Sequence, residues 1–122
     1  MQVNVQDRSV LYKTPEPVVV PEGIYPAVLV GVRCFANAFG QRVGLVFEIT
    51  SGPHKGAELM EAAALNPSPR GKLADLLRGI GGAAGDLATA RELVGRRCQI
   101  VVRNETSKAG KTYAAIIQTM RR

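Results

Sequence analysis

Apolar and polar residues alternate along most of this chain, and such alternation is typical of β-strands with one buried face. The pattern is clearest over 41–50, QRVGLVFEIT. Similar patterns predict four further strands, over 24–35, 57–65, 96–104 and 112–120. The residues expected to face the core from the two most regular strands are Val43, Leu45, Phe47, Ile49, Cys98, Ile100 and Val102.

The first predicted strand, IYPAVLVGVRCF, contains a glycine at its centre. Strict alternation assigns one face to Val28, Val30, Val32 and Cys34. It assigns the other face to Tyr25, Ala27, Leu29, Gly31, Arg33 and Phe35. Gly31 permits a sharp bend or a β-bulge, which a strand serving two faces of a barrel requires.

A helical spacing follows the third predicted strand. Apolar residues at i, i+3, i+4 and i+7 form one stripe, consisting of Leu73, Leu76, Leu77 and Ile80. Ser68 is suited to the N-cap and Pro69 to the first helical position, and the glycines at 79, 81 and 82 are expected to end the helix. The segment ARELVG at 90–95 predicts one more helical turn.

The predicted order is three strands, a helix and two strands. This order predicts an all-β fold with a small inserted helix, namely a five-stranded OB-like barrel whose helix lies between strands 3 and 4. A small α+β sheet with one helix on a face is the alternative, which explains the apolar stripe but not the bend at Gly31. Residues 23–122 would form the barrel domain.

Residues 1–22 are expected to form an extended, proline-rich N-terminal arm. Pro15, Pro17 and Pro21 forbid a helix there. The apolar residues Val18 to Val20 would dock on the domain or on a second subunit. Because edge strands and an apolar arm both favour pairing, we expect a homo-oligomer.

The charge is distributed unevenly over a chain with a formal net charge of +6. Residues 1–61 carry five basic and six acidic side chains, whereas residues 62–122 carry eleven basic and four acidic ones. A basic half predicts a polyanionic partner, nucleic acid before membrane, since no basic amphipathic helix is evident. No apolar run is long enough to cross a bilayer and no signal-peptide pattern is present, so we expect a cytoplasmic protein and no membrane partner.

The sequence favours neither an enzyme nor a metal or cofactor site. His54 is the single histidine and, with Cys34 and Cys98, supplies too few ligands for a structural zinc site. No phosphate-binding loop motif occurs, and no spacing indicates a catalytic triad. Both cysteines are expected to be small buried hydrophobic residues, with a disulfide between them as the less favoured alternative.

Three segments carry a resemblance to a known family: PEGIYPAVLVGV, FGQRVGLVFEITSGPHKGAEL and LVGRRCQIVVRNETSKAGKTYAAI, which begin at residues 21, 39 and 93. The chain resembles small phage- and plasmid-borne proteins with a predicted OB fold that are thought to bind single-stranded DNA. The resemblance implies sequence-independent binding of single-stranded DNA in phage or plasmid replication or recombination. It also implies replication or recombination proteins as partners, in a bacterial or phage-infected cell.

Single-strand binding needs cations for the phosphates and flat rings for the bases. In an OB fold the two loops that flank the binding face join strands 1–2 and 4–5, and here these segments are RCFANAFGQR at 33–42 and RNETSKAGKTY at 103–113. The candidate phosphate contacts are Arg33, Arg42, Arg97, Arg103, Lys108 and Lys111, with Gln99 on the same outward stripe as Arg97 and Arg103. The candidate stacking residues are Phe35, Phe39 and Tyr113.

Each of these residues also has a structural interpretation. The phenylalanines would then cap the core, Tyr113 would pack across strands, and the cations would lie on a solvated surface. An alternative function follows, in which the OB fold is a protein-interaction module that docks an acidic partner of a replication complex without binding DNA. The candidate residues suit DNA and RNA equally.

Overall fold

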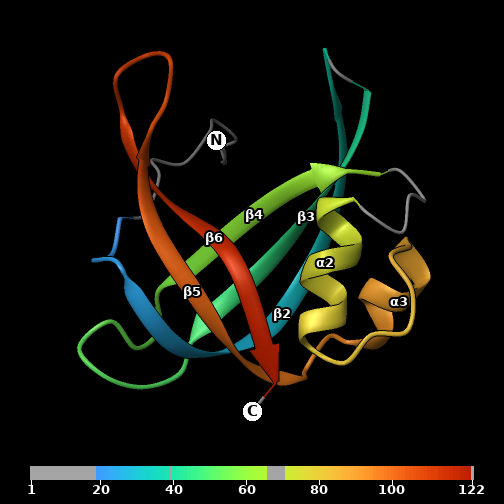
Figure 1. The fold of residues 1–122 in the computed structure, drawn as a ribbon, viewed down its shortest axis with the longest axis horizontal. Coiled ribbons are helices and arrows are strands. Elements are labelled where there is room, and N and C mark those ends of the chain that lie inside the picture. Colours follow the sequence, from blue (N-terminus) through green and yellow to red (C-terminus); the bar gives the residue numbers. More distant parts are fainter. Residues whose placement is uncertain (1–18, 39, 66–70, 122) are drawn as a thin grey trace, which may run out of the picture.

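The computed structural model describes residues 19–38, 40–65 and 71–121. These residues form five antiparallel strands in one sheet and two short helices (Figure 1). The elements are β2 (Gly23–Asn37), β3 (Gly40–Ile49), β4 (Glu58–Ala64), α2 (Lys72–Gly79), α3 (Leu87–Glu92), β5 (Arg97–Thr106) and β6 (Thr112–Arg121). All five predicted strands are therefore confirmed, with ends that differ from the predicted ones by one or two residues.

The sheet has the strand order β4-β3-β2-β5-β6. The long strand β2 lies at its centre and is shared between two neighbours. Its first part, Gly23 to Val28, pairs with β5, and its later part, from Ala27 to Asn37, pairs with β3. No ladder joins the edge strands β4 and β6 in the described part of the chain, so the sheet is not closed and the predicted OB-like barrel is not confirmed.

A β-bulge interrupts β2 at the position where the sequence predicts a bend. Leu29 pairs with Phe47, but the next pair is Gly31 with Val46, so Val30 is an extra residue. An extra residue reverses which side chains face inward. The prediction that one face carries both Leu29 and Phe35 is therefore wrong: Leu29 lies in the core, whereas Phe35 lies on the outer face, as does Arg33.

The core lies on the inner face of the sheet and under α2. Val43, Leu45, Phe47 and Ile49 are fully buried, as predicted. The inward residues of β5 and the helical stripe are also buried: Cys98, Ile100, Val102, Leu73, Leu76, Leu77 and Ile80. This confirms the inward assignments of β3, β5 and α2.

Helix α2 lies against the open side of the sheet (Figure 1). The Thr119 hydroxyl on β6 donates to the carbonyl of Leu76 at 2.6 Å. Gly79 permits this approach, since a Cβ there would lie 2.3 Å from the carbonyl oxygen of Thr119. At its described start, Gly71 is the N-cap, and the Gly71 carbonyl accepts a hydrogen bond from the Asp75 backbone N–H at 3.1 Å.

The predicted positions of Ser68 and Pro69 at that start lie outside the described residues, as do residues 1–18 of the predicted arm. The second helix, α3, is the helical turn predicted near 90–95. It begins earlier than predicted, because the Asp86 carboxylate accepts a hydrogen bond from the Thr89 backbone N–H at 2.8 Å and caps it. The same bond lowers the pKa of Asp86.

The described end of the predicted arm packs on the domain. Val20 is buried in the core. The Asn104 side chain donates to the Val20 carbonyl, and the Asn104 backbone N–H donates to the Glu22 carboxylate, each at 2.9 Å. These bonds connect residues 20–22 to β5. No helix among the described residues is both long and apolar enough to span a membrane.

Candidate nucleic-acid interface

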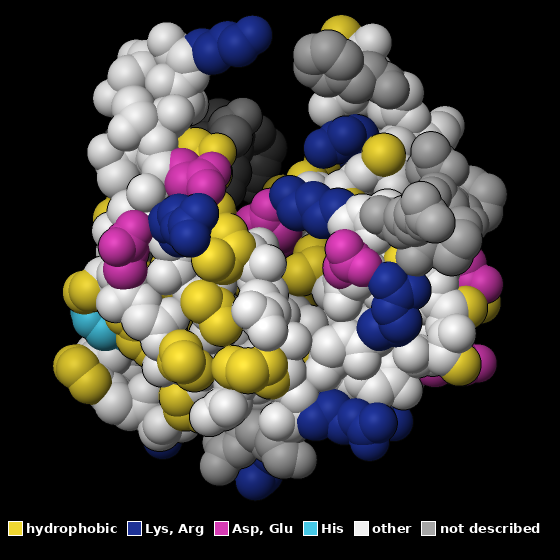
Figure 2. Space-filling view, viewed as in Figure 1, with side chains coloured by type: hydrophobic (Ala, Val, Ile, Leu, Met, Phe, Trp, Pro, Cys, Tyr) yellow, Lys and Arg dark blue, Asp and Glu magenta, His cyan; other side chains and the backbone are white. Residues whose placement is uncertain are grey.

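Two β-hairpins extend beyond the sheet in the same direction, one formed by β2 and β3 and the other by β5 and β6 (Figure 1). Figure 2 shows that the molecule is hollowed between them. The two hairpins contain the segments in which the sequence concentrates cations and aromatic rings. They therefore define the candidate interface.

The β2–β3 hairpin brings three candidate residues onto one face. Phe35 pairs directly with Arg42 across the two strands, and Arg33 pairs with Gly44, two residues along on the same face. The Phe35 side chain lies outside the buried core cluster and is 36% exposed. Arg42 is partly buried, and its Nε atom is shielded from solvent with no hydrogen-bond partner among the described residues. Phe39, the other predicted stacking residue of this hairpin, lies outside the described residues.

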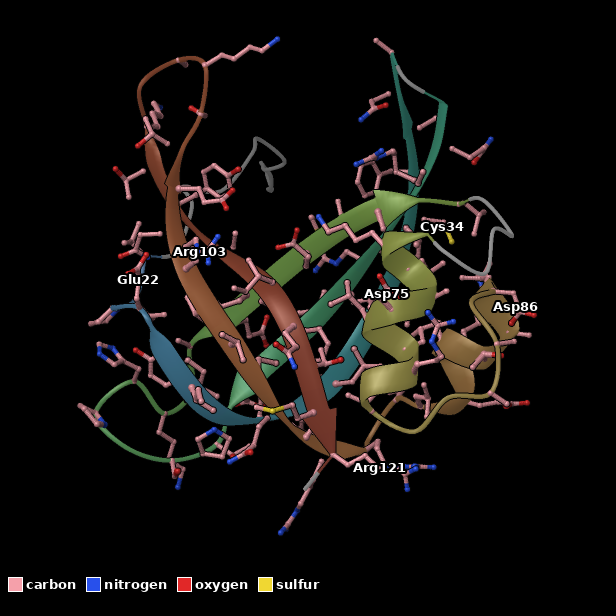
Figure 3. All side chains as sticks on the ribbon, viewed as in Figure 1. Glu22, Cys34, Asp75, Asp86, Arg103 and Arg121 are labelled. Atoms are coloured by element: carbon pink, nitrogen blue, oxygen red, sulfur yellow. The ribbon has the colours of Figure 1, made fainter. Side chains whose placement is uncertain are left out.

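Cys34 lies on the opposite face of this hairpin and is exposed. In Figure 3 it lies near one end of α2. The prediction that it is buried is wrong, because the hairpin continues past the sheet to a point where no core covers its inner face. Cys98 is buried as predicted, and burial raises the pKa of its thiol to about 11. Both thiols are free.

The β5–β6 hairpin carries exposed lysines in its loop. Lys108 and Lys111 lie in a turn closed by a bond from the Ser107 backbone N–H to the Lys111 carbonyl, at 2.8 Å. A second bond joins the Gly110 N–H to the Ser107 carbonyl, at 2.9 Å. Gly110 has φ of +83°, a conformation that favours glycine. The turn is therefore a defined structure that holds two cations at its surface.

Tyr113 lies next to the loop of the same hairpin and pairs with Glu105. Its hydroxyl makes a long hydrogen bond of 3.4 Å to the Glu105 carboxylate. Desolvation and this carboxylate both raise the pKa of Tyr113, since each disfavours the charged phenolate. The ring is partly buried, and this cross-strand contact leaves only part of it accessible.

The outward stripe on β5 extends away from the hairpins. Arg103 pairs with Ala115 near the hairpin, whereas Gln99 pairs with Pro26 and Arg97 with Val28. At about 3.3 Å per residue, Arg97 lies roughly 30 Å along β5 from the loop. The structure therefore groups the candidate residues into two hairpin clusters and leaves Arg97 and Gln99 outside them.

The candidate cations form no ion pair with a carboxylate in the part of the chain that the structure describes. Within the described ranges, the ion pairs between side chains are Lys72 with Glu61 and Arg78 with Asp75. Neither pair includes one of the six candidates. Unpaired guanidinium and ammonium groups are available to phosphate oxygens.

A feature that the sequence reasoning missed is an acidic pocket at the open seam between β4 and β6. Its volume is about 420 Å³, and its charged lining consists of Glu61, Asp75, Glu105 and Lys72. Glu61 bridges the seam, because its carboxylate accepts the Ile116 backbone N–H at 2.8 Å and pairs with Lys72. Three carboxylates against one ammonium disfavour a phosphate inside this pocket. The signal in the sequence was a glutamate at an inward position of β4, between Leu59 and Ala63.

Comparison with known proteins adds no assignment. No protein-family model matches the chain, and no curated protein matches it.

Proposed function

We propose that this protein binds single-stranded DNA, largely without sequence preference, through the outer faces and loops of its two hairpins. The observation that carries the proposal is the partly exposed Phe35 ring beside Arg33 and Arg42 on one hairpin, together with the exposed lysines of the other. The arginines would hold phosphates while Phe35 stacks on a base. Phe39 and the accessible part of Tyr113 would add stacking surface.

The arrangement of the strands supports an OB-type architecture. The central strand β2 is bent by a bulge and shared between β3 and β5, and α2 lies beside the seam between β4 and β6. We propose that the sheet is a partly open OB barrel, a form in which the loops between strands 1–2 and 4–5 contact oligonucleotides. These loops correspond to the two hairpins described above.

A single strand fits this interface better than a duplex. Stacking on Phe35 requires an unstacked base, which a duplex does not offer. The acidic seam pocket repels phosphates from its interior, so the backbone of the strand would follow the two hairpins. By the family resemblance, we place this activity in phage or plasmid replication or recombination, with proteins of that process as partners.

The proposal is tested by fluorescence anisotropy with a labelled oligo-dT of about 30 nucleotides, at two salt concentrations, beside a duplex of the same length. We expect binding that prefers the single strand and weakens as salt rises. An RNA oligonucleotide of equal length reports the preference between DNA and RNA. Absence of binding at low salt, from a protein with a net charge of +6, would refute the proposal.

The alternative function is a protein-interaction module that docks an acidic partner. Its support is the open sheet, since each edge strand has one side without a ladder partner among the described residues, and such edges accept a strand from another chain. The same edges support the proposed homo-oligomer, which light scattering would measure. Such a module would bind a defined protein and show no length-dependent binding to oligonucleotides.

A further inference from the structure

A second group of arginines lies at the end of the sheet opposite the hairpins. Arg97 begins β5, Arg96 precedes it, and Arg121 ends β6, where it pairs with Cys98. Figure 3 shows Arg121 at this end of the molecule. We call these three residues the base cluster.

Two guanidinium groups of the base cluster converge on Gly81. A Cβ at Gly81 would lie 3.0 Å from Nη1 of Arg96 and 3.7 Å from Nε of Arg121. All three arginines are exposed, and within the described ranges none has a carboxylate partner. Like charges held this close repel each other unless an anion lies between them.

The end of α2 does not explain the cluster. Its last carbonyl groups are already bonded, because the backbone N–H of Gly81 donates to Arg78 and that of Gly82 donates to Leu77, at 3.0 and 2.8 Å. Compensation of the helix dipole needs only one cation, and Arg78 in the last turn of α2 supplies it. The base cluster therefore provides positive charge beyond what the helix requires.

The base cluster lies where the outer face of β5 ends: Arg97 points outward, whereas Arg121 pairs with the buried Cys98 and lies with Arg96 beside Gly81, at the end of α2. Arg97, Gln99 and Arg103 point outward along this strand and connect the base to the β5–β6 hairpin. We infer that the base cluster binds phosphates of the same nucleic-acid strand that the hairpins hold. This inference rests on the proposed function and assigns Arg96 and Arg121, which were not among the candidate binding residues, to the interface.

If the base cluster binds the same strand as the hairpins, the contribution of its arginines to the affinity depends on the length of the oligonucleotide. The path along β5 is about 30 Å long, which corresponds to roughly nine nucleotides at the stacked spacing of 3.4 Å per phosphate, and to fewer in an extended strand. An oligo-dT of about six nucleotides would occupy the hairpins alone. One of about 30 nucleotides would reach both regions.

The test compares the wild type with the double variant Arg96→Ala/Arg121→Ala on both oligonucleotides at low salt. We expect the affinity for the long oligonucleotide to fall roughly tenfold and its salt slope to decrease by about 1.4, as for two lost phosphate contacts. The affinity for the short one should not change. Lys55→Ala, a charge removed from the exposed β3–β4 turn, is the control and should leave both affinities within about twofold of the wild type.

The charge-preserving variant Arg96→Lys/Arg121→Lys should restore most of the affinity for the long oligonucleotide. The melting temperature of each variant shows whether it is folded. Equal losses on both oligonucleotides, or no loss on the long one, would overturn the inference while the proposed function stands. Failure of the wild type to bind either oligonucleotide would refute both.

Discussion

At the scale of single residues, the two hairpins hold side chains that lie outside the buried core. Phe35 is the clearest example, because its ring is 36% exposed and is not part of the core cluster. Its neighbour Arg42 lies directly across the hairpin. A ring flanked by two arginines is an arrangement suited to a base and its phosphates.

Phe35→Ala should weaken binding to oligo-dT by about 1–3 kcal/mol, because one stacked base is lost. It should change the melting temperature little, since the ring lies outside the core. The matched control is Ile24→Ala, which truncates a side chain that is 59% exposed at the other end of the same strand. A large loss of stability with unchanged affinity would show instead that Phe35 is a structural residue.

The two cysteines should differ in reactivity. Burial raises the pKa of Cys98 to about 11, so its thiol stays protonated at pH 8, whereas Cys34 is exposed. Alkylation of the folded protein with iodoacetamide, followed by mass spectrometry, should modify Cys34 first. Equal rates of alkylation at Cys34 and Cys98 would contradict this expectation and would mean that the region around Cys98 opens. Denatured protein is the reference, because both cysteines react in it.

At the scale of elements, two contacts position α2 and the edge strands. The first is the close approach of α2 to β6 at Gly79 and Thr119. The second is the Glu61 carboxylate, which joins β4 to the β6 backbone and to Lys72 at the start of α2. These contacts join α2 and β4 to β6, where a closed barrel would have backbone hydrogen bonds between β4 and β6.

Gly79→Ala should destabilise the protein by about 1–3 kcal/mol, because the added Cβ would meet the Thr119 carbonyl oxygen at 2.3 Å. The better helix propensity of alanine, about 1 kcal/mol, does not offset this clash with backbone. Denaturant unfolding measures the difference. Gly31→Ala is the control, since its nearest contact would be an ordinary 3.9 Å to Val46, and a comparable loss there would contradict the explanation.

Glu61→Ala should cost about 1–3 kcal/mol of unfolding free energy, because it leaves the Ile116 N–H without its acceptor and Lys72 without its partner. Glu61→Gln should cost less, since the amide oxygen still accepts the Ile116 bond. Glu58→Ala, at an exposed position of the same strand, is the control. Denaturant unfolding measures these differences. An equal loss of unfolding free energy in the Ala and Gln variants would rule out the hydrogen bond from Ile116 as the cause.

At the scale of the whole molecule, the distribution of charge decides what the protein attracts. The cations of the hairpins and the base cluster have no carboxylate partner among the described residues, whereas the carboxylates Glu61 and Glu105 line the seam pocket. A polyanion would therefore be bound along the outer surface.

The logarithm of the affinity for an oligo-dT of about 30 nucleotides should fall linearly with the logarithm of salt concentration. Eight phosphate contacts, six by the candidate cations and two by Arg96 and Arg121, would give a slope of about −6 for a single strand. Anisotropy titrations at four or more salt concentrations measure it, with potassium glutamate against chloride as a check on anion effects. A slope near zero would exclude phosphate tracking as the mode of binding.

The features that the sequence predicted are those that depend on residues close together in the chain. Strand β3 and the stripe of α2 were predicted down to their buried residues, because burial of one face imposes a period of 2 or 3.6 on neighbouring positions. The grouping of Arg33, Phe35 and Arg42 was also predictable in part, since a short hairpin brings its own two strands together.

The sequence by itself determined the five strands, the order of elements and the excess of positive charge, because each depends on residues close together in the chain or on composition alone. Only the tertiary structure decided that the bulge at Val30 moves Arg33 and Phe35 to the outer face, and that Glu61 bridges an open seam. It alone placed Arg96 beside Arg121. These features depend on register and contact between segments far apart in the chain, which local periodicity does not encode.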